Sequence, residues 1–436
     1  MTDGANQIGP PQWLLQMNRD FAVVVIGSKV RIARWIPNPL MPESQTIEFM
    51  QEADFIRLFA NHRVPVNGAH MTLGSAWLHH LDRRQYIGGV LFAPGEELSN
   101  QHLNLWTGFG VKPKRGKIKP ILDFIREVIA DGDEELYRFI IAWLADAVQN
   151  PGKRPGTALV LRGGQGVGKS FFGETICDLY GCHALELTDP RHLTGNFNSH
   201  LLDKAMIFVD EGAFGHPSAI SKLKNIVTSD RMIVEPKGVD SFETRNCLRV
   251  IIAGNDPKLI SAAGDERRYA VIDVGDSRKE DHEYFGELAE WRNNGGISSL
   301  LYHLMNYDFR GINLRTAPRN TALLDIKLAS LDPFNTWWLD RLMAGEPVLN
   351  RKWEDFIPRS EMHADYVSET GFLRDRSLET EFGKGLKKLV PNLRNKRLTV
   401  GKKRPWGYLF PPLEECRKGF EKMLGQPVKW LDGTED

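Results

Sequence analysis

The sequence predicts an α/β protein whose core is a parallel sheet carrying a phosphate-binding loop (P-loop). After residue 157, short apolar strands alternate with helical stretches, which is typical of a parallel sheet with helices on both faces. A glycine-rich loop at 163–170 follows the first of these strands and precedes a helix. The chain has 436 residues, 42% hydrophobic and 26% charged, a composition that excludes a disordered or fibrous protein. We expect this core to be flanked by an N-terminal α+β region and a smaller C-terminal unit.

Residues 1–115 are predicted to be the mixed α+β region. The β-branched runs 21–26 and 29–34 flank Gly27-Ser28, which indicates a hairpin with a two-residue turn. Apolar spacing predicts helices over 47–59 and 75–82, and a loop rich in glycine, lysine and proline closes the region at 107–119. No motif assigns this region a chemical role, and oligomerisation and partner docking are hypotheses for it.

The remaining boundaries follow from changes in pattern. Residues 116–150 are predicted to be a helical, collar-like segment with helices over 120–130 and 133–149. The P-loop core is predicted to span 151–316. Its strands are predicted at 158–161, 205–209, 250–253 and 270–274, and a helical stretch at 282–306 follows them. A helix over 321–344 makes 317–345 a helical connector, and 346–436 form the C-terminal unit.

The strongest motif runs from Gly163 to Ser170 and fits the P-loop pattern G-x-x-x-x-G-K-[ST] at every fixed position. Glycines let backbone N–H groups turn toward phosphate oxygens, and the start of the following helix adds partial positive charge. Lys169 is expected to reach the β and γ phosphates of ATP, and Ser170 to ligate Mg²⁺. The predicted nucleotide-binding residues are Gly163, Gly164, Gln165, Gly166, Val167, Gly168, Lys169 and Ser170.

Two further strands end in polar side chains. Asp210 and Glu211 follow the strand 205–209; Asp210 would join the Mg²⁺ shell and Glu211 would polarise the attacking water. Phosphate transfer to a small molecule has less use for a second carboxylate, so the pair favours hydrolysis. Asn255 lies just beyond the strand 250–253, where a neutral amide can contact the γ phosphate without adding like charge. On its own, an asparagine there is equally consistent with a plain turn.

Arg267 and Arg268 stand just before the strand 270–274. An arginine offered to the γ phosphate of a neighbouring subunit would stabilise charge in the transition state. The alternative is that both arginines form surface salt bridges with Asp265 and Glu266.

Together, these motifs resemble the superfamily-3 helicases of viruses, phages and plasmids, in particular the phage-type primase-helicase proteins. The resemblance is clearest from residue 131 to residue 273 and looser on both flanks. It implies an AAA+-like core that assembles as a homo-oligomeric ring, for which we expect a hexamer, and that uses ATP to move along one strand of DNA.

The resemblance also implies roles for single residues. The loop 163–170 matches the family's A motif, Asp210-Glu211 its B motif and Asn255 its C motif. Between the B and C motifs the family has a hairpin whose tip lysine touches DNA, and Lys237 is the candidate here, with Phe242 packing the hairpin. Arg268 best matches the finger supplied by the adjacent subunit, with Arg267 in reserve. Lys153 or Arg154 is a further candidate for a charge supplied in trans.

This chain departs from the family pattern at its N-terminal side. Members often carry a primase-polymerase domain with paired catalytic acids, but residues 1–115 show no convincing pair. Asp131 and Asp133 have the spacing of such a pair, yet they lie where a helix begins and are better explained as capping residues. The sequence also lacks a cluster of zinc ligands. We therefore expect a motor without priming activity, with a separate primase or polymerase as a further partner.

The C-terminal unit carries a concentrated positive charge. Residues 383–404 contain nine basic side chains and no acidic one. The pattern predicts a helix over 378–389 and strands over 396–400 and 406–410, with Lys402, Lys403 and Arg404 in the turn between them. A helix followed by a basic hairpin is how a winged helix presents itself to DNA, so we expect contacts to phosphates here. The alternative is a solvated face without a ligand.

Charge and cysteine content set further limits. Lysine plus arginine and aspartate plus glutamate both number 56, so any attraction to nucleic acid must come from local patches. The four cysteines have no C-x-x-C spacing, which argues against a zinc ribbon and a disulfide framework. The longest apolar run, 139–148, is far shorter than the ~20 residues of a membrane span, and 1–11 lack a signal pattern. We expect a protein of the cytoplasm, that of a bacterial host if a phage encodes it, with no membrane partner.

The leading hypothesis is an ATP-dependent DNA helicase of phage or mobile-element replication, which translocates on single-stranded or forked DNA. Lys169, Asp210, Glu211, Asn255 and Arg268 would be its catalytic residues, and Ser170 and Asp210 its Mg²⁺ ligands. The alternative is a DNA-binding ATPase switch, such as a replication initiator or loader, that does not unwind processively. Glu211 and Asn255 disfavour a small-molecule kinase, and the intact P-loop disfavours a DNA-binding protein without enzymatic activity.

Overall fold

The computed structural model describes residues 10–39, 45–66, 68–189, 191–195, 198–210, 217–235, 240–255, 267–371, 377–399 and 404–430. The chain divides into two compact units. The first comprises Met1–Asn255 and Ile272–Ala317, and the second comprises Asp256–Val271 and Pro318–Asp436.

The first unit begins with a small mixed sheet covered by helices. Its strand order is β3-β2-β1-β6, and the predicted hairpin is confirmed, since Ile26 pairs with Lys29 across a turn in which Gly27 has φ +56°. Phe21, Phe55 and Trp77 form the centre of its core. The strands are β1 (Phe21–Ile26), β2 (Lys29–Pro37), β3 (Gln45–Met50) and β6 (Gln85–Tyr86), and the helices are α1 (Gln12–Asp20), α2 (Glu52–Leu58) and α3 (Leu73–Leu78). The same region contains two separate pairs of short strands. β4 (Arg63–Val66) pairs with β5 (Ala69–Thr72), and β7 (Gly89–Leu91) pairs with β8 (His102–Asn104).

The helix predicted over 47–59 is wrong for its first half. Gln45–Met50 is the strand β3, which pairs antiparallel with β2 from Pro37↔Gln45 to Ile32↔Met50. Only the second half of the predicted range is helical, where α2 begins after Gln51. The residues of β3 include β-branched and aromatic side chains that suit a strand, and pairing with a neighbouring strand decided the outcome.

In the helical segment before the core, the capping interpretation is confirmed for Asp133, whereas Asp131 lies two residues earlier with a left-handed backbone (φ +48°). α4 (Lys119–Phe124) continues into a π-helical turn (Ile125–Ile129), and α5 (Glu134–Gln149) follows. The Asp133 carboxylate accepts hydrogen bonds from the backbone N–H groups of Glu135 and Leu136, at 2.9 and 3.0 Å. Asp133 is therefore the N-cap of α5, a position that favours aspartate because its side chain satisfies free N–H groups of the first turn.

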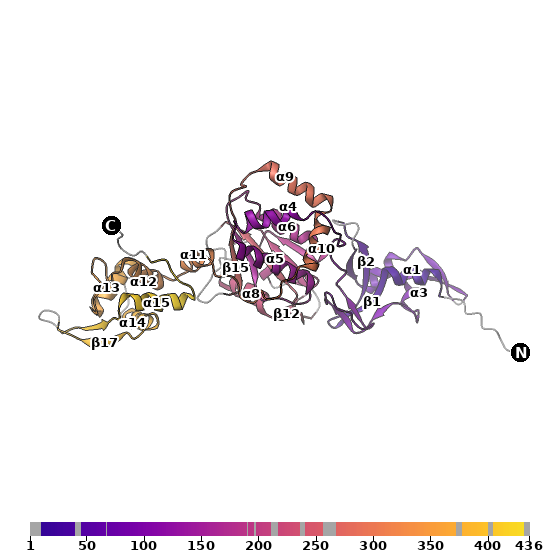
Figure 1. Cartoon of the computed structure of the whole chain (residues 1–436). Helices are drawn as coiled ribbons and strands as arrows, with labels where there is room; N and C mark the ends of the chain where they lie inside the picture. The colour runs from indigo at the N-terminus through magenta and orange to yellow at the C-terminus, as the bar shows by residue number, and fades with distance from the viewer. Residues whose placement is uncertain are drawn as a thin grey trace. The chain divides into compact units, whose positions relative to one another are not determined.

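The core of the first unit is the predicted parallel sheet, with strand order β10-β11-β14-β9-β15. β10, β11, β14 and β9 pair in parallel, and β9, β11 and β14 are almost completely buried. The strands are β9 (Ala158–Arg162), β10 (Ala184–Leu187), β11 (Met206–Val209), β14 (Arg249–Gly254) and β15 (Tyr269–Asp273), of which β10 was not predicted. α6 (Lys169–Tyr180) packs on β10, β11 and β14, and α10 (Ile297–Asn306) packs on α5 and α6. Figure 1 shows α4, α5, α6, α9 (His282–Trp291) and α10 gathered around this sheet.

A two-stranded hairpin lies in the interval where the DNA-contacting hairpin was expected. β12 (Arg231–Val234) pairs antiparallel with β13 (Phe242–Arg245), and Val234 is opposite Phe242 at the end nearer the tip. Lys237 lies outside the described residues. α7 (Arg191–Thr194) and α8 (Pro217–Thr228) precede the hairpin.

The second unit has its own core and a three-stranded sheet in the order β16-β18-β17. The helix predicted over 321–344 is two helices, because Asp332 and Pro333 start a new one with the Asp332 side chain as its N-cap. Trp337 and Trp338 of the second helix are buried in the same core as Tyr408 and Phe420, so this helix packs as part of the C-terminal unit. The elements are α11 (Thr321–Ala329), α12 (Pro333–Ala344), β16 (Phe356–Pro358), α13 (Arg359–Thr370), α14 (Ser377–Leu389), β17 (Arg394–Arg397), β18 (Trp406–Leu409) and α15 (Leu413–Leu424), drawn in orange to yellow in Figure 1.

Candidate nucleotide-binding site

The loop between β9 and α6 has a backbone that requires glycine at two positions. Gly166 and Gly168 have φ of +76° and +97°, in the left-handed region that other residues rarely adopt. A side chain at Gly168 would also begin 2.8 Å from the ring of Phe285. Gly168 is the N-cap of α6, so the loop places the start of this helix, with its free N–H groups, at the end of β9.

The Lys169 side chain links the loop to the neighbouring strand. It is only 7% exposed, and its Nζ donates to the carbonyl oxygens of Gly163 (2.7 Å) and Gly164 and to Oδ1 of Asn255 (2.9 Å). Asn255 follows β14, which lies next to β9 in the sheet. The predicted lysine and the predicted asparagine therefore meet because parallel strands end at the same edge.

Ser170 and Asp210 meet in the same way. The Ser170 hydroxyl donates to Oδ2 of Asp210 at 2.7 Å, and Asp210 follows β11, the strand on the other side of β14. The Asp210 backbone is fixed by its N–H, which donates to the Leu187 carbonyl at the end of β10 (2.8 Å). A hydroxyl and a carboxylate at this distance are oxygen ligands of the kind that Mg²⁺ takes.

A cavity of about 400 Å³ opens over these side chains. Besides the loop, Asp210 and Asn255, it is lined by Phe171, Glu280, His282 and Phe285. The Glu280 backbone N–H donates to the Gly166 carbonyl (3.1 Å), which ties the loop to the start of α9. Sequence reasoning missed Glu280, His282 and Phe285, because they lie more than a hundred residues after the loop and belong to no motif.

An ion pair holds the sheet together beside the site. Arg162, the last residue of β9, donates from Nε and Nη2 to the two carboxylate oxygens of Asp273 at the end of β15, at 2.5 and 2.7 Å. This two-pronged contact is the strong form of an arginine–carboxylate pair, and it fixes where β9 ends and the loop begins.

The structure does not place the other predicted site residues that it describes among those lining the cavity at the nucleotide-binding loop. Glu211, Lys237, Lys402 and Lys403 lie outside the described residues. Arg267 is exposed and Arg268 is half-buried; both precede β15 and fall in the second compact unit. Arg404 is exposed, two residues before β18.

Arg154 is not available as a charge for a neighbouring subunit. Its guanidinium is 5% exposed and donates to the backbone carbonyls of Val227 (2.8 Å), Ser229 and Asn246 (2.8 Å) and to Asp230. It therefore satisfies carbonyls at the end of α8 and just after β13, and burial lowers the pKa of its guanidinium. Lys153, by contrast, is exposed.

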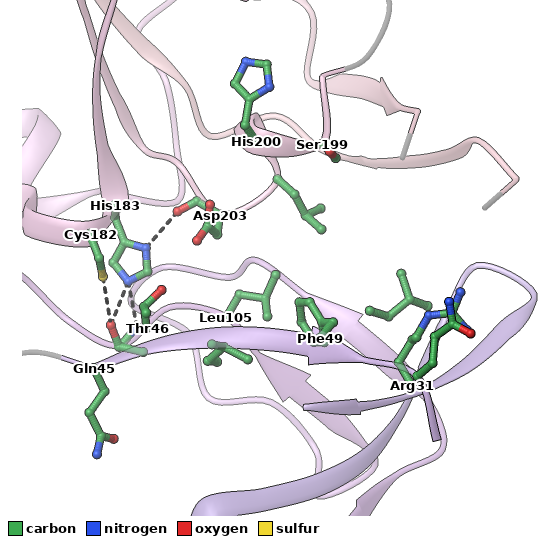
Figure 2. Close-up of a pocket in the computed structure, with 15 residues that line it drawn as sticks. Arg31, Gln45, Thr46, Phe49, Leu105, Cys182, His183, Ser199, His200 and Asp203 are labelled. Atoms are coloured by element: carbon green, nitrogen blue, oxygen red, sulfur yellow. Dashed lines mark hydrogen bonds between the residues drawn. The ribbon is translucent and has the colours of Figure 1, made fainter. Parts of the chain in front are cut away.

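A second cavity, of about 550 Å³, lies between β3 and the region around β10 (Figure 2). At its end, the buried His183 contacts the Asp203 carbonyl through Nδ1 (2.8 Å), while the Thr107 backbone N–H donates to Nε2 (2.9 Å). The N–H donor at Nε2 requires an unprotonated nitrogen there, so Nδ1 carries the proton and the ring is neutral. Burial lowers the pKa of His183 to about 4, which agrees with this state.

The described residues offer neither a metal cluster nor a membrane span. No group of three or more histidine, cysteine, aspartate or glutamate side chains in the described ranges is placed to hold a metal ion. Within the same ranges, no helix is long and apolar enough to cross a membrane.

The comparisons with known proteins point to phage replication. Residues 161–268 match the model of a family of unknown function, DUF5906, a stretch that includes the P-loop, Asp210, Asn255 and Arg268. The DNA primase-polymerase of Nitratiruptor phage NrS-1 is 25% identical over 205 residues, which are 45% of this chain and 28% of that protein. The match thus spans less than a third of the relative's length.

The fold is that of a part of the same phage protein. The apo structure of the NrS-1 C-terminal region superposes with a TM-score of 0.69 at 15% identity, covering 92% of this chain and 99% of that one. A further apo structure of the region, the A form, gives a TM-score of 0.66 at 16% identity with the same coverage. The chain is therefore similar to a phage replication protein and shares the fold of its C-terminal region.

Proposed function

We propose that this chain is an ATP-dependent DNA motor of phage or mobile-element replication, built on an AAA+-like core of superfamily-3 helicase type. The observation that carries the proposal is the convergence of Lys169, Ser170, Asp210 and Asn255 at the ends of three adjacent parallel strands. Their order along the chain is that of the A, B and C motifs. Each lies within the stretch that matches the family model.

The residues present fit ATP with Mg²⁺. Lys169 bonds to loop carbonyls and to Asn255, contacts that a phosphate could replace without leaving a buried ammonium unpaired. Ser170 and Asp210 would hold the Mg²⁺ ion, which would neutralise phosphate charge. Glu211 is proposed to activate the water, Asn255 to sense the γ phosphate, and Arg268, with Arg267 in reserve, to complete the site of an adjacent subunit. This arrangement implies a homo-oligomer, for which we propose a hexameric ring.

The second unit is proposed to bind DNA as a winged helix. Its elements follow the order helix, strand, helix, helix, strand, strand from α12 to β18, with β18 between β16 and β17. Exposed basic side chains lie on α14 and β17: Lys384, Lys387, Lys388, Arg394, Lys396 and Arg397. Arg397 also lies over the Trp406 ring, 5.1 Å from its centre, which ties the two strands together. Lys402, Lys403 and Arg404 would extend this surface, and Lys237 would contact DNA from the β12–β13 hairpin.

The similarity to a phage primase-polymerase supports a replication role, and with it a bacterial host cytoplasm and a partner that primes or extends DNA. The absence of priming activity in this chain remains a prediction. Its basis is the sequence of residues 1–115, which has no convincing pair of catalytic acids.

An unwinding assay on a forked duplex tests the proposal. A motor should release the labelled strand in the presence of ATP and Mg²⁺, and Lys169→Ala should abolish release. A DNA-binding ATPase switch would hydrolyse ATP without releasing the strand, so that pattern would favour the alternative.

Mixing Lys169→Ala with Arg268→Ala subunits should restore part of the activity, because some interfaces would then contain both intact residues. No recovery at any ratio would reject Arg268 as a finger.

A further inference from the structure

A basic segment crosses the first unit at the end of α6 that is distant from the P-loop. Residues 110–119, here called the basic strap, contain Lys112, Lys114, Arg115, Lys117 and Lys119. No acidic residue occurs between Glu97 and Asp123, although the chain as a whole has no net charge. The strap is therefore a local concentration of positive charge of the kind that attracts a polyanion.

The backbone of the strap is fixed at several points. The Gly110 N–H donates to the Leu179 carbonyl in the last turn of α6 (2.8 Å), and the Lys114 N–H donates to the Ser298 carbonyl (3.0 Å). The Trp291 indole N–H donates to the Lys117 carbonyl (2.7 Å). The chain also packs closely, since a side chain at Gly110 would begin 2.6 Å from the Asp178 carbonyl.

The side chains of the strap point the other way, into solvent. Lys112, Lys114, Arg115 and Lys117 are exposed, and none forms an ion pair with any residue that the structure describes. Lys119 differs, because it pairs with Asp123. A fixed backbone with unpaired cations loses little backbone freedom when it binds, which favours contact with a charged ligand.

Neighbouring charges show which part of the strap is open to an anion. A hollow beside Lys117 and Lys119 is lined by four carboxylates and one further cation, Arg278, which pairs with Asp281; the carboxylates are Asp123, Glu127, Glu287 and Glu290. Carboxylates there would repel phosphates from this end of the strap. The cations at Lys112, Lys114 and Arg115 are the ones left free of that repulsion.

We propose that the basic strap is a third DNA contact, separate from the hairpin and the C-terminal unit, and that it binds the phosphate backbone of single-stranded DNA. Residues 110–118 of the strap form neither a helix nor a two-stranded ribbon, the elements that enter a duplex groove. The nearby aromatic rings are engaged within the protein, because Trp106 stacks on His183 and Phe109 meets Tyr180 edge to face. The contact would therefore follow phosphates and be independent of base sequence. This inference rests on the proposed function in one respect, namely that DNA is the polyanion.

α6 gives the contact a mechanical link to the nucleotide site. The helix begins at Lys169 and ends at Tyr180, where the strap is bonded to it. Twelve residues of helix span about 18 Å, so a rigid element joins the P-loop to the strap. A second, indirect link passes through α9. Trp291 bonds to the strap, and the next residue, Arg292, pairs with Glu174 and Asp178 on α6.

The test compares two full-length variants that have the same reduction in charge. The strap variant is Lys112→Gln/Lys114→Gln/Arg115→Gln, and the control is Arg19→Gln/Arg57→Gln/Arg63→Gln, which removes exposed arginines from the N-terminal sheet region. Anisotropy of labelled oligo-dT is measured over a salt series, with a duplex of mixed sequence as the second ligand. DNA-free ATP hydrolysis reports that the fold and the nucleotide site are intact.

The strap variant should bind oligo-dT more weakly than the control at low salt. The slope of log affinity against log salt should become shallower by about 0.7 for each phosphate that the strap no longer neutralises, about 2 in total. Equal slopes for the two variants, or weaker binding confined to the duplex, would overturn the inference. If the unaltered chain bound neither ligand, the proposed function would fall and the inference with it.

Discussion

Lys169 and Asn255 are joined by a hydrogen bond of 2.9 Å between Nζ and Oδ1, which connects the P-loop to the end of β14. Under the proposed function, the Asn255 amide would contact the γ phosphate of bound ATP. We expect Asn255→Ala to lower the rate of ATP hydrolysis by at least about tenfold, because one polar group facing the developing charge would be missing. Nucleotide affinity should change much less.

The measurement is steady-state phosphate release together with binding of a fluorescent ATP analogue. Asn306→Ala, which removes an exposed amide at the end of α10, is the control and should leave both unchanged. An Asn255→Ala variant with unaltered turnover would show that this residue is only a turn residue.

Arg154 should act on stability. Arg154→Ala would leave buried carbonyls of Val227 and Asn246 without a donor, and we expect a decrease of about 3 kcal/mol in the free energy of unfolding. Lys153→Ala, one residue away and exposed, should cost less than about 0.5 kcal/mol. Urea denaturation of both variants checks this, and an Arg154→Ala variant as stable as the parent would contradict the buried position.

His183 should make the first unit less stable in acid. Its pKa is about 4 in the folded chain and 6.5 unperturbed, so the unfolded chain binds the extra proton between these values. The contribution of neutral His183 to the free energy of unfolding is complete above pH 6.5 and is lost as the pH falls toward 4. The loss amounts to about 2 kcal/mol by pH 5. Comparing urea midpoints at pH 7 and pH 5 measures the effect. His183→Asn should be less stable at pH 7 but lose less on acidification, whereas the exposed His70→Asn should behave like the parent.

The four cysteines should differ in reactivity. Cys177, Cys247 and Cys416 are buried, and burial raises the pKa of their thiols, to about 11 for Cys247 and about 12 for Cys416. Cys182 is partly exposed at the rim of the second cavity. One thiol per native chain should therefore react rapidly with a disulfide reagent, and Cys182→Ser should remove that phase. A rapid phase that persists in the variant would show that a buried thiol is accessible.

The parts of the fold that could be predicted from the sequence are those with strong local signals. The buried strands β9, β11 and β14 are short apolar runs, each followed by polar residues that mark the sheet edge. The hairpin at Gly27 and the cap at Asp133 also have local chemical causes. These features needed no knowledge of distant contacts.

The errors arose where a distant contact decides the structure. β3 became a strand through its pairing with β2, and β10 is a short edge strand whose sequence alternates weakly. Arg154 was a candidate for a charge supplied to a neighbouring subunit, because it precedes the first core strand. Its guanidinium is instead bonded to carbonyls about 75 residues later in the chain. Glu280 and Phe285 belong to the candidate site only because α9 begins beside the P-loop.

The most direct test of the central claim is phosphate release from ATP as single-stranded DNA is added, compared between the parent chain and Lys169→Ala. The account predicts Mg²⁺-dependent hydrolysis that DNA stimulates and that Lys169→Ala abolishes, since the ammonium of this residue is held at the centre of the site. Hydrolysis no greater than that of Lys169→Ala at every DNA concentration would contradict the account.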